Sequence, residues 1–385
     1  MLKKLNLKRY INYIILISIA LVLTVLSLVE ALDGLTVAFL EKAMMSAVLA
    51  MSLSLVVGFL GELSLGHAGF MCVGAFLGGK IAAVFAATAL GNSVFTLILS
   101  LIAGGVSAAF CGFIIGLPAL RLKGDYLAIV TLAFGEIVRV IFMNVSPKAF
   151  GGPLGLKTPV LDRIFIVGMV FVILTYAVCQ NLIKSKHGRA ITAIRDNEIA
   201  ARATGINVTK YKLTTFIIAA FFAGIAGVLY SYSNSRIQSG NFDFNYSIDI
   251  LVMVVIGGMG SLNGSLIAAV LITWLNTQLT TILTGNLAVL QSIIYALILI
   301  LIVIYNNAPA LKGVREKYNV RVFVERIKSF VAEKIFKIKL DEVEIDAEDA
   351  ASWDKIPSKI RMDEVLSIDL IVKDENKQSK SKEEK

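Results

Sequence analysis

The chain has 385 residues, of which 57% are hydrophobic and 17% are charged, whereas an ordinary globular protein is about 25% charged. The last 74 residues hold 17 of the 37 basic and 17 of the 28 acidic residues, so the first 311 residues are sparsely charged and carry the whole net charge of +9. This distribution excludes an ordinary soluble protein and predicts a polytopic membrane domain, 1–311, followed by a polar tail.

Apolar segments of roughly 20 residues, the length that crosses about 30 Å of hydrocarbon, recur along the chain as far as residue 306. They predict an all-α polytopic membrane protein with about ten transmembrane segments, in a range of roughly eight to ten. The first follows basic residues, as a signal peptide does, but no A-x-A cleavage site comes after it, so we expect it to remain as a span. The expected spans are 11–32, 43–60, 67–88, 93–117, 126–145, 163–183, 213–232, 248–260, 262–280 and 288–306.

The basic residues predict the orientation of these spans. Ten spans place both termini on one side, and the loops of that side hold 13 basic residues against four in the opposite loops. By the positive-inside rule, the side with 13 is cytoplasmic, and the expected location is the bacterial cytoplasmic (inner) membrane.

Two glycine-rich interruptions, at 58–69 and 257–264, break the apolar regions. Non-helical backbone at membrane depth is tolerated where it is buried in protein or lines a wet cavity, and there its free N–H and C=O groups can hold a polar solute. Close helix packing and an ordinary loop are the two alternatives. The candidate residues of a translocation pathway are Glu62, Ser64, His67, Gly257, Gly258, Gly260 and Asn263.

Two charges fall inside the fifth expected span. An isolated charge near the bilayer centre costs at least about 2.5 to 3.5 kcal/mol, so such residues find a partner or face water. Glu136 and Arg139 are three positions apart on one helix, which favours an intramembrane ion pair over direct contact with a solute.

Catalytic and metal sites are not predicted. The three cysteines are far apart in apolar stretches, and the chain shows neither metal-ligand spacing nor a nucleophile with a base. The segment 74–80 fits G-x-x-x-x-G-K, but Ile81 follows where a phosphate loop needs Ser or Thr. We therefore expect no enzyme, no cofactor and no nucleotide bound by this chain itself.

The loop 184–212 carries seven basic residues between the sixth and seventh expected spans. Helix-forming residues from Arg189 to Thr204, followed by Gly205 as a natural stop, predict a short helix outside the membrane. A passive loop that only orients the protein needs the charge but not the helix, so we interpret this segment as a docking element. Its expected apolar side consists of Ile191, Ile194, Ile199 and Ala203.

The tail divides into two segments. Segment 312–340 has nine basic and three acidic residues with apolar residues at helical spacing, which predicts a basic amphipathic helix on the inner leaflet, against a cytoplasmic partner, or in solvent. Segment 341–385 has eight basic and fourteen acidic residues and is expected to be mostly mobile. Both are expected on the cytoplasmic side.

Four ordered blocks carry a family resemblance: 61–70 (GELSLGHAGF), 117–139, 188–201 (GRAITAIRDNEIAA) and 255–264 (VIGGMGSLNG). Together they resemble high-affinity branched-chain amino-acid permeases, specifically the LivM-like partner of a LivH/LivM pair. The block around Glu198 resembles the "EAA" coupling motif of ATP-binding-cassette importers, with the glutamate one residue earlier than usual and without the later proline.

The resemblance implies a permease subunit of an ATP-driven importer for leucine, isoleucine and valine. Its implied partners are a homologous second permease subunit, two cytoplasmic ATPases that bind the ATP, an extracytoplasmic solute-binding protein and membrane lipid, but no nucleic acid. Urea or short-amide importers share the blocks, and a stand-alone secondary transporter or channel is the alternative from another class. The residues expected to couple to the ATPase are Arg189, Arg195, Glu198, Ala200, Ala201 and Gly205.

Overall fold

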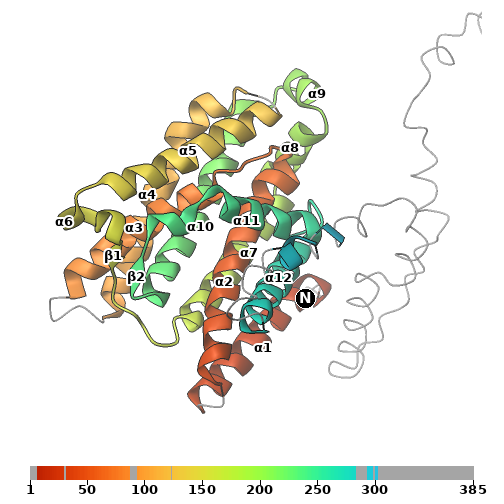
Figure 1. Cartoon of the computed structure of the whole chain (residues 1–385). Helices are drawn as coiled ribbons and strands as arrows, with labels where there is room; N and C mark the ends of the chain where they lie inside the picture. The colour runs from red at the N-terminus through yellow and green to blue at the C-terminus, as the bar shows by residue number, and fades with distance from the viewer. Residues whose placement is uncertain are drawn as a thin grey trace, which may run out of the picture. The chain divides into compact units, whose positions relative to one another are not determined.

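The computed structural model describes residues 7–29, 32–86, 93–122, 124–282, 293–297 and 300–301. Within this part of the chain, seven helices are long and apolar enough to cross a membrane (Figure 1). They are α2 (Gly34–Ser54) continued by the π-helix η1 (Leu55–Leu60), α3 (His67–Ala86), α4 (Val94–Ala119), α5 (Asp125–Asn144), α7 (Phe165–Lys184), α10 (Val208–Ser233) and α12 (Leu262–Ile282). The helical, polytopic membrane class is thereby confirmed.

Two other helices are apolar over shorter stretches: α1 (Leu7–Leu28) and α11 (Phe244–Gly257). Each of the first nine expected spans therefore corresponds to a helix. The tenth, 288–306, and both tail segments, 312–340 and 341–385, lie largely or wholly outside the described residues. The count of ten crossings stays a prediction.

Helix α2 begins at Gly34, nine residues before the expected span, because Asp33 caps it and Glu41 finds a partner. Asp33 caps the helix and accepts a hydrogen bond from the backbone N–H of Thr36. Glu41 accepts one from the hydroxyl of Ser233 at the end of α10. A carboxylate that looks like a boundary in the sequence thus lies inside the helix.

Short elements connect the long helices. Two short strands, β1 (Leu156–Lys157) and β2 (Arg236–Ile237), pair antiparallel, with Leu156 opposite Ile237. They lie at the end of the bundle that holds the last turns of α3 and α10. The loop between α7 and α10 forms two helices, which Figure 1 shows near one end of α2. The short elements are α6 (Pro147–Phe150), η2 (Gly152–Leu154), β1 (Leu156–Lys157), α8 (Lys186–Asp196), α9 (Glu198–Ala203), β2 (Arg236–Ile237) and η3 (Ser239–Phe242).

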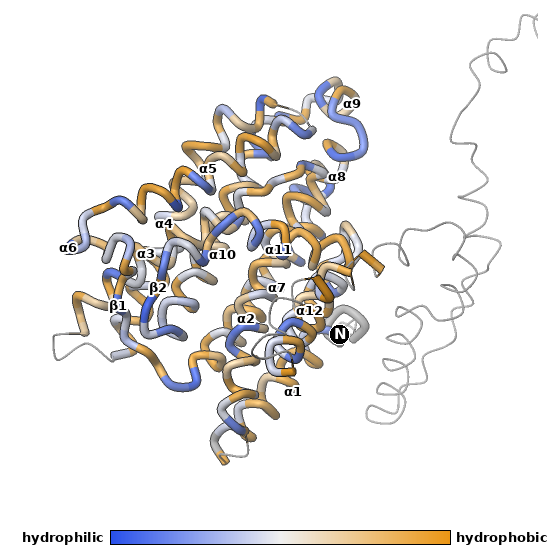
Figure 2. The backbone as a smooth tube through the Cα atoms, in the orientation of Figure 1, coloured by the Kyte–Doolittle hydropathy of each residue, from blue (hydrophilic) through white to orange (hydrophobic). Residues whose placement is uncertain are grey.

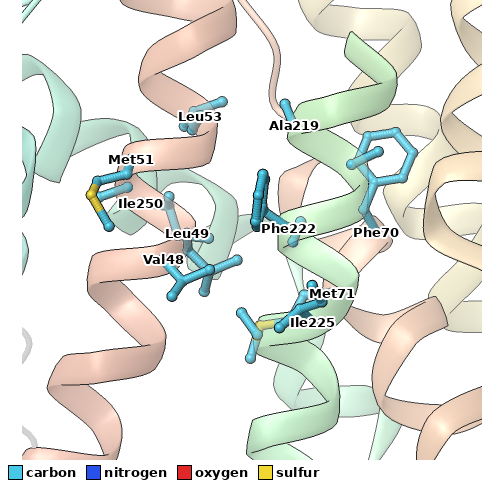
Figure 3. Packing of buried hydrophobic residues seen from close by; sticks show 14 of the residues in the cluster. Val48, Leu49, Met51, Leu53, Phe70, Met71, Ala219, Phe222, Ile225 and Ile250 are labelled. Carbon is cyan, nitrogen blue, oxygen red and sulfur yellow. The ribbon is translucent and has the colours of Figure 1, made fainter. Parts of the chain in front are cut away.

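Helices α2 and α10 form the centre of the packing. Figure 3 shows Leu49 and Leu53 of α2 near Phe222 of α10, with Phe70 and Met71 of α3 on the other side of α10. Helix α10 also packs along α4. The core therefore combines helices from both halves of the sequence.

Glycines allow α3 and α10 to approach each other closely. A methyl group placed on Gly227 would lie 2.0 Å from the carbonyl oxygen of Met71, and one on Gly74 would lie 2.2 Å from that of Gly224. Small residues at such crossings let backbones pack directly, which is the main source of helix association in lipid.

We expect Gly227→Ala to destabilise the fold by about 2 kcal/mol or more, because the added methyl group overlaps the backbone of α3. The control is Gly34→Ala at the start of α2, where nothing lies within 4 Å and the expected change is within about 0.5 kcal/mol. Thermal unfolding in detergent measures both. Equal midpoints for the two variants would contradict the packing described above.

The outer faces of α4 and α5 are apolar. Figure 2 shows hydrophobic colour along most of both helices, and their exposed side chains are largely apolar. Lipid or another membrane subunit can cover such a surface, whereas water cannot do so favourably. The exposed large apolar residues of these helices include Phe95, Ile98, Ile102, Val106, Phe110, Phe113, Ile114, Leu117, Tyr126, Ile129, Ile137, Val140 and Ile141.

Candidate functional site

The first glycine break leads the chain back into the bundle. Helix η1 ends at Leu60, and Gly61 adopts the left-handed conformation with φ +79°. The chain is then non-helical until α3 begins at His67, whose Nε2 lies 2.8 Å from the hydroxyl of Ser52. Because Ser52 lies well before the end of η1, α3 starts inside the bundle and not at its edge.

This interior helix start is largely satisfied by protein groups. The N–H of Ala68 donates to the hydroxyl of Ser247 on α11 at 3.1 Å, and the N–H of Leu65 donates to Thr131 on α5 at 3.0 Å. Ser64 is also buried, and its hydroxyl has no partner among the described residues. Two backbone N–H groups of this segment are thus bonded to protein hydroxyls.

The second break joins α11 to α12. Gly258 and Gly260 have φ +89° and +85°, a conformation that favours glycine. A methyl group on Gly264 would lie 1.7 Å from the carbonyl oxygen of Gly257. Gly257 and Gly264 therefore pack directly against each other, and positive φ favours glycine at positions 258 and 260.

The two breaks touch each other and the α8 helix. A methyl group on Gly58 would lie 2.6 Å from the backbone nitrogen of Gly260, so the two backbones are in direct contact. From α8, Nη1 of Arg195 donates to the carbonyl oxygen of Gly58 at 3.2 Å. The stem of Arg195 covers Gly61, where a methyl group would lie 2.6 Å from its Cγ. One side chain of the loop therefore contacts two residues of the first break, beside the point where that break touches the second.

A second link between the loop and the first break is a buried ion-pair network. Lys212, in the first turns of α10, is only 3% exposed. Its ammonium pairs with Glu62 of the break and lies 3.3 Å from a carboxylate oxygen of Glu198, the first residue of α9. The other oxygen of Glu198 accepts from the exposed Arg202 at 2.9 Å.

Lys212 was not a site candidate from the sequence, where it counted only as one of the loop's basic residues. The signal that could have found it is its place at the start of an apolar helix, in a chain that also has carboxylates at Glu62 and Glu198 beside its apolar segments. Nothing in the sequence shows that these three residues meet.

The expected single helix from Arg189 to Thr204 is wrong in one respect, because it breaks at Asn197 into α8 and α9. Asn197 is extended, with φ −158°, and its side chain accepts from the N–H of Ala200 at 3.0 Å. Such a cap starts a new helix, as asparagine commonly does. At the other end Gly205, φ +85°, closes α9 as expected, with the N–H of Ile206 bonded to Ala201.

The break also changes which residues are buried. Ile191 and Ile194 of α8 are buried as expected, but Ile199 of α9 is 78% exposed and Ala203 is exposed. The expected continuous apolar side is therefore wrong, because the turn at Asn197 rotates α9 relative to α8. The exposed surface here, which we call the α9 surface, consists of Ile199, Ala200, Ala203 and Gly205.

The remaining candidates have other contacts. Arg139 and Glu136 form an ion pair at 2.7 Å, and Glu136 also accepts from the N–H of Phe244 at the start of α11. Asn263 accepts a hydrogen bond from Tyr176 of α7 at 2.8 Å. Arg189 of α8 is exposed, and Ala201 of α9 is buried.

Comparison with known proteins now assigns the family. Residues 35–303 match the family model described as the permease component of a branched-chain amino acid transport system. The chain belongs to this family. The resemblance seen in the four sequence blocks is therefore confirmed.

Several permeases of known name are similar to this family member. The high-affinity branched-chain amino acid transport system permease protein LivM of Salmonella typhimurium is 36% identical over 60% of this chain and 60% of its own length. LivM of Escherichia coli is 35% identical over 62% of each. The ribose import permease protein RbsC of Escherichia coli is 30% identical over 50% of this chain and 59% of its own length. The chain thus spans about 60% of the length of these relatives, and no solved structure matches it.

Proposed function

We propose that this chain is the membrane-spanning permease subunit of an ATP-driven importer of branched-chain amino acids. Family membership and the two LivM relatives support the transport class and the solute. The contacts of Arg195 with Gly58 and Gly61 carry the mechanism, because they connect a loop outside the long helices to the first glycine break, which itself touches the second.

In this proposal, the α9 surface and the exposed Arg189 meet a cytoplasmic ATPase. A push on these residues is transmitted because no flexible linker separates the elements: only Ser185 stands between α7 and α8, and its hydroxyl accepts from the N–H groups of His187 and Gly188. Movement of α8 shifts Arg195, and with it Gly58. Movement of α9 acts on Lys212 through Glu198.

The proposed topology is that of the sequence prediction. Ten spans place both termini and the loop 184–212 in the cytoplasm of a bacterium, with β1 and β2 facing an extracytoplasmic solute-binding protein. A homologous second permease subunit and membrane lipid cover the exposed apolar faces, and two ATPases bind the ATP. The chain itself binds no nucleotide.

Uptake by the assembled complex tests the solute. The complex in proteoliposomes is expected to take up labelled leucine only with ATP and binding protein, and unlabelled leucine is expected to compete where urea and ribose do not. Competition by ribose instead would place the chain with its RbsC relatives, and competition by urea with the short-amide importers. Leucine transport by the permease without ATPases would favour a secondary transporter and contradict the proposal.

A second expected result concerns the α9 surface. We expect Ile199→Glu to lower co-purification of the ATPases at least tenfold with little change in unfolding temperature, because this side chain is 78% exposed and touches no core. The matched control is Leu154→Glu in η2, whose side chain is 68% exposed in a loop that the proposed topology places outside the cell. Equal ATPase recovery for both variants would show that α9 is not the docking surface.

A further inference from the structure

A polar cavity lies beside the coupling contacts. Its volume is about 280 Å³, and it opens between the end of α4, α9 and the start of α10. Its lining consists of the apolar Leu120 and Val208, the cations Arg121, Arg202 and Lys212, the carboxylate Glu198, and Thr209. Since one water takes up about 30 Å³ of liquid volume, this space is large enough for a phosphate group with its glycerol.

The charges around this cavity do not cancel. Lys212 is matched by Glu62 behind it, and Arg202 by Glu198. The guanidinium of Arg121 has no carboxylate partner among the described residues. Three cations and two carboxylates therefore leave one surplus positive charge, which suits a singly charged anion.

The end of α4, which contributes to the cavity, also carries exposed apolar residues. Leu117, at the end of α4, and Leu122 and Tyr126, around the start of α5, are all exposed large side chains close in sequence to Arg121. A phospholipid presents this same combination, a phosphodiester joined to acyl chains, whereas an acidic protein side chain has no acyl chains to cover such a surface.

We propose that this cavity binds the phosphodiester headgroup of an anionic phospholipid, with Arg121 as its main contact. A bound headgroup lies beside Glu198 and Lys212 and therefore stabilises the arrangement of α9 on α10. The importance of this effect for transport rests on the proposed function. Binding itself depends on neither solute nor ATP.

Lipid titration of the purified complex, followed by native mass spectrometry, tests the proposal. Wild-type protein is expected to retain one phosphatidylglycerol per chain in preference to phosphatidylcholine. Arg121→Gln is expected to weaken this binding about fivefold, the effect of one basic residue near an anionic headgroup, and Arg121→Lys to weaken it less. The matched control, Arg236→Gln in β2 at the opposite end of the bundle, is expected to change nothing.

Three outcomes would overturn the proposal. The first is equal retention of both lipids by wild-type protein, or an unchanged titration for Arg121→Gln. The second is displacement of phosphatidylglycerol by millimolar inorganic phosphate, which would identify a site for the free anion. The third is loss of the ATPases from Arg121→Gln in phosphatidylcholine alone, which would identify an acidic protein surface as the occupant. Failed leucine uptake, by contrast, affects only the proposed function.

Discussion

Arg195→Ala is expected to lower ATP-driven leucine uptake at least tenfold while the chain remains folded and bound to its ATPases. The guanidinium donates a charge-assisted hydrogen bond to Gly58, a contact worth about 1.5–3 kcal/mol, and its stem fills the space above Gly61. Without this side chain, movement of α8 no longer reaches the first break. Uptake and ATP hydrolysis are measured together in proteoliposomes, and the ratio of the two rates is expected to fall.

Two further variants sharpen this test. Lys186→Ala removes an exposed cation from the same helix and is expected to leave the ratio unchanged. Gly61→Ala is expected to resemble Arg195→Ala, because the added methyl group overlaps Cγ of Arg195 and the φ of +79° disfavours alanine. The double variant is expected to be no worse than either single one, since both remove one contact. An unchanged ratio of leucine uptake to ATP hydrolysis in Arg195→Ala would contradict the proposed mechanism.

Lys212→Met is expected to cost about 3–5 kcal/mol of folding stability, because it leaves the largely buried carboxylate of Glu62 without the lysine that neutralises it. The matched control is Arg202→Ala: this arginine also pairs with Glu198, but its side chain is 68% exposed, so the expected cost is about 1 kcal/mol or less. Unfolding midpoints in detergent, with temperature or denaturant, measure the difference.

The double variant Glu62→Gln with Lys212→Met separates charge from packing. Replacing Glu62 by Gln removes the carboxylate charge that Lys212→Met leaves without its lysine. The double variant is therefore expected to be more stable than Lys212→Met alone. If the single lysine variant is no less stable than Arg202→Ala, the network is not the buried link described here. If the double variant recovers nothing, the loss reflects packing of the lysine stem.

Several parts of the site followed from local sequence. Gly205 ends α9 because only a residue tolerant of positive φ continues the chain there, and this signal lies within four residues. Glu136 and Arg139 pair because three positions bring side chains onto one helix face. By the same kind of reasoning Asn197 could have been read as a cap, but the helix-forming residues around it outweighed that signal.

The sequence by itself determined the membrane class and the approximate positions of the helices, because both depend on hydropathy over windows of about 20 residues. The glycine-rich segments between these helices could also be read directly from the sequence. Tertiary structure alone decided that Gly58 meets Gly260, that Arg195 reaches across 137 positions to Gly58, and that Lys212 is buried between two carboxylates. The physical reason is that helix packing in lipid depends on which small residues allow two surfaces to touch, and hydropathy does not distinguish one apolar surface from another.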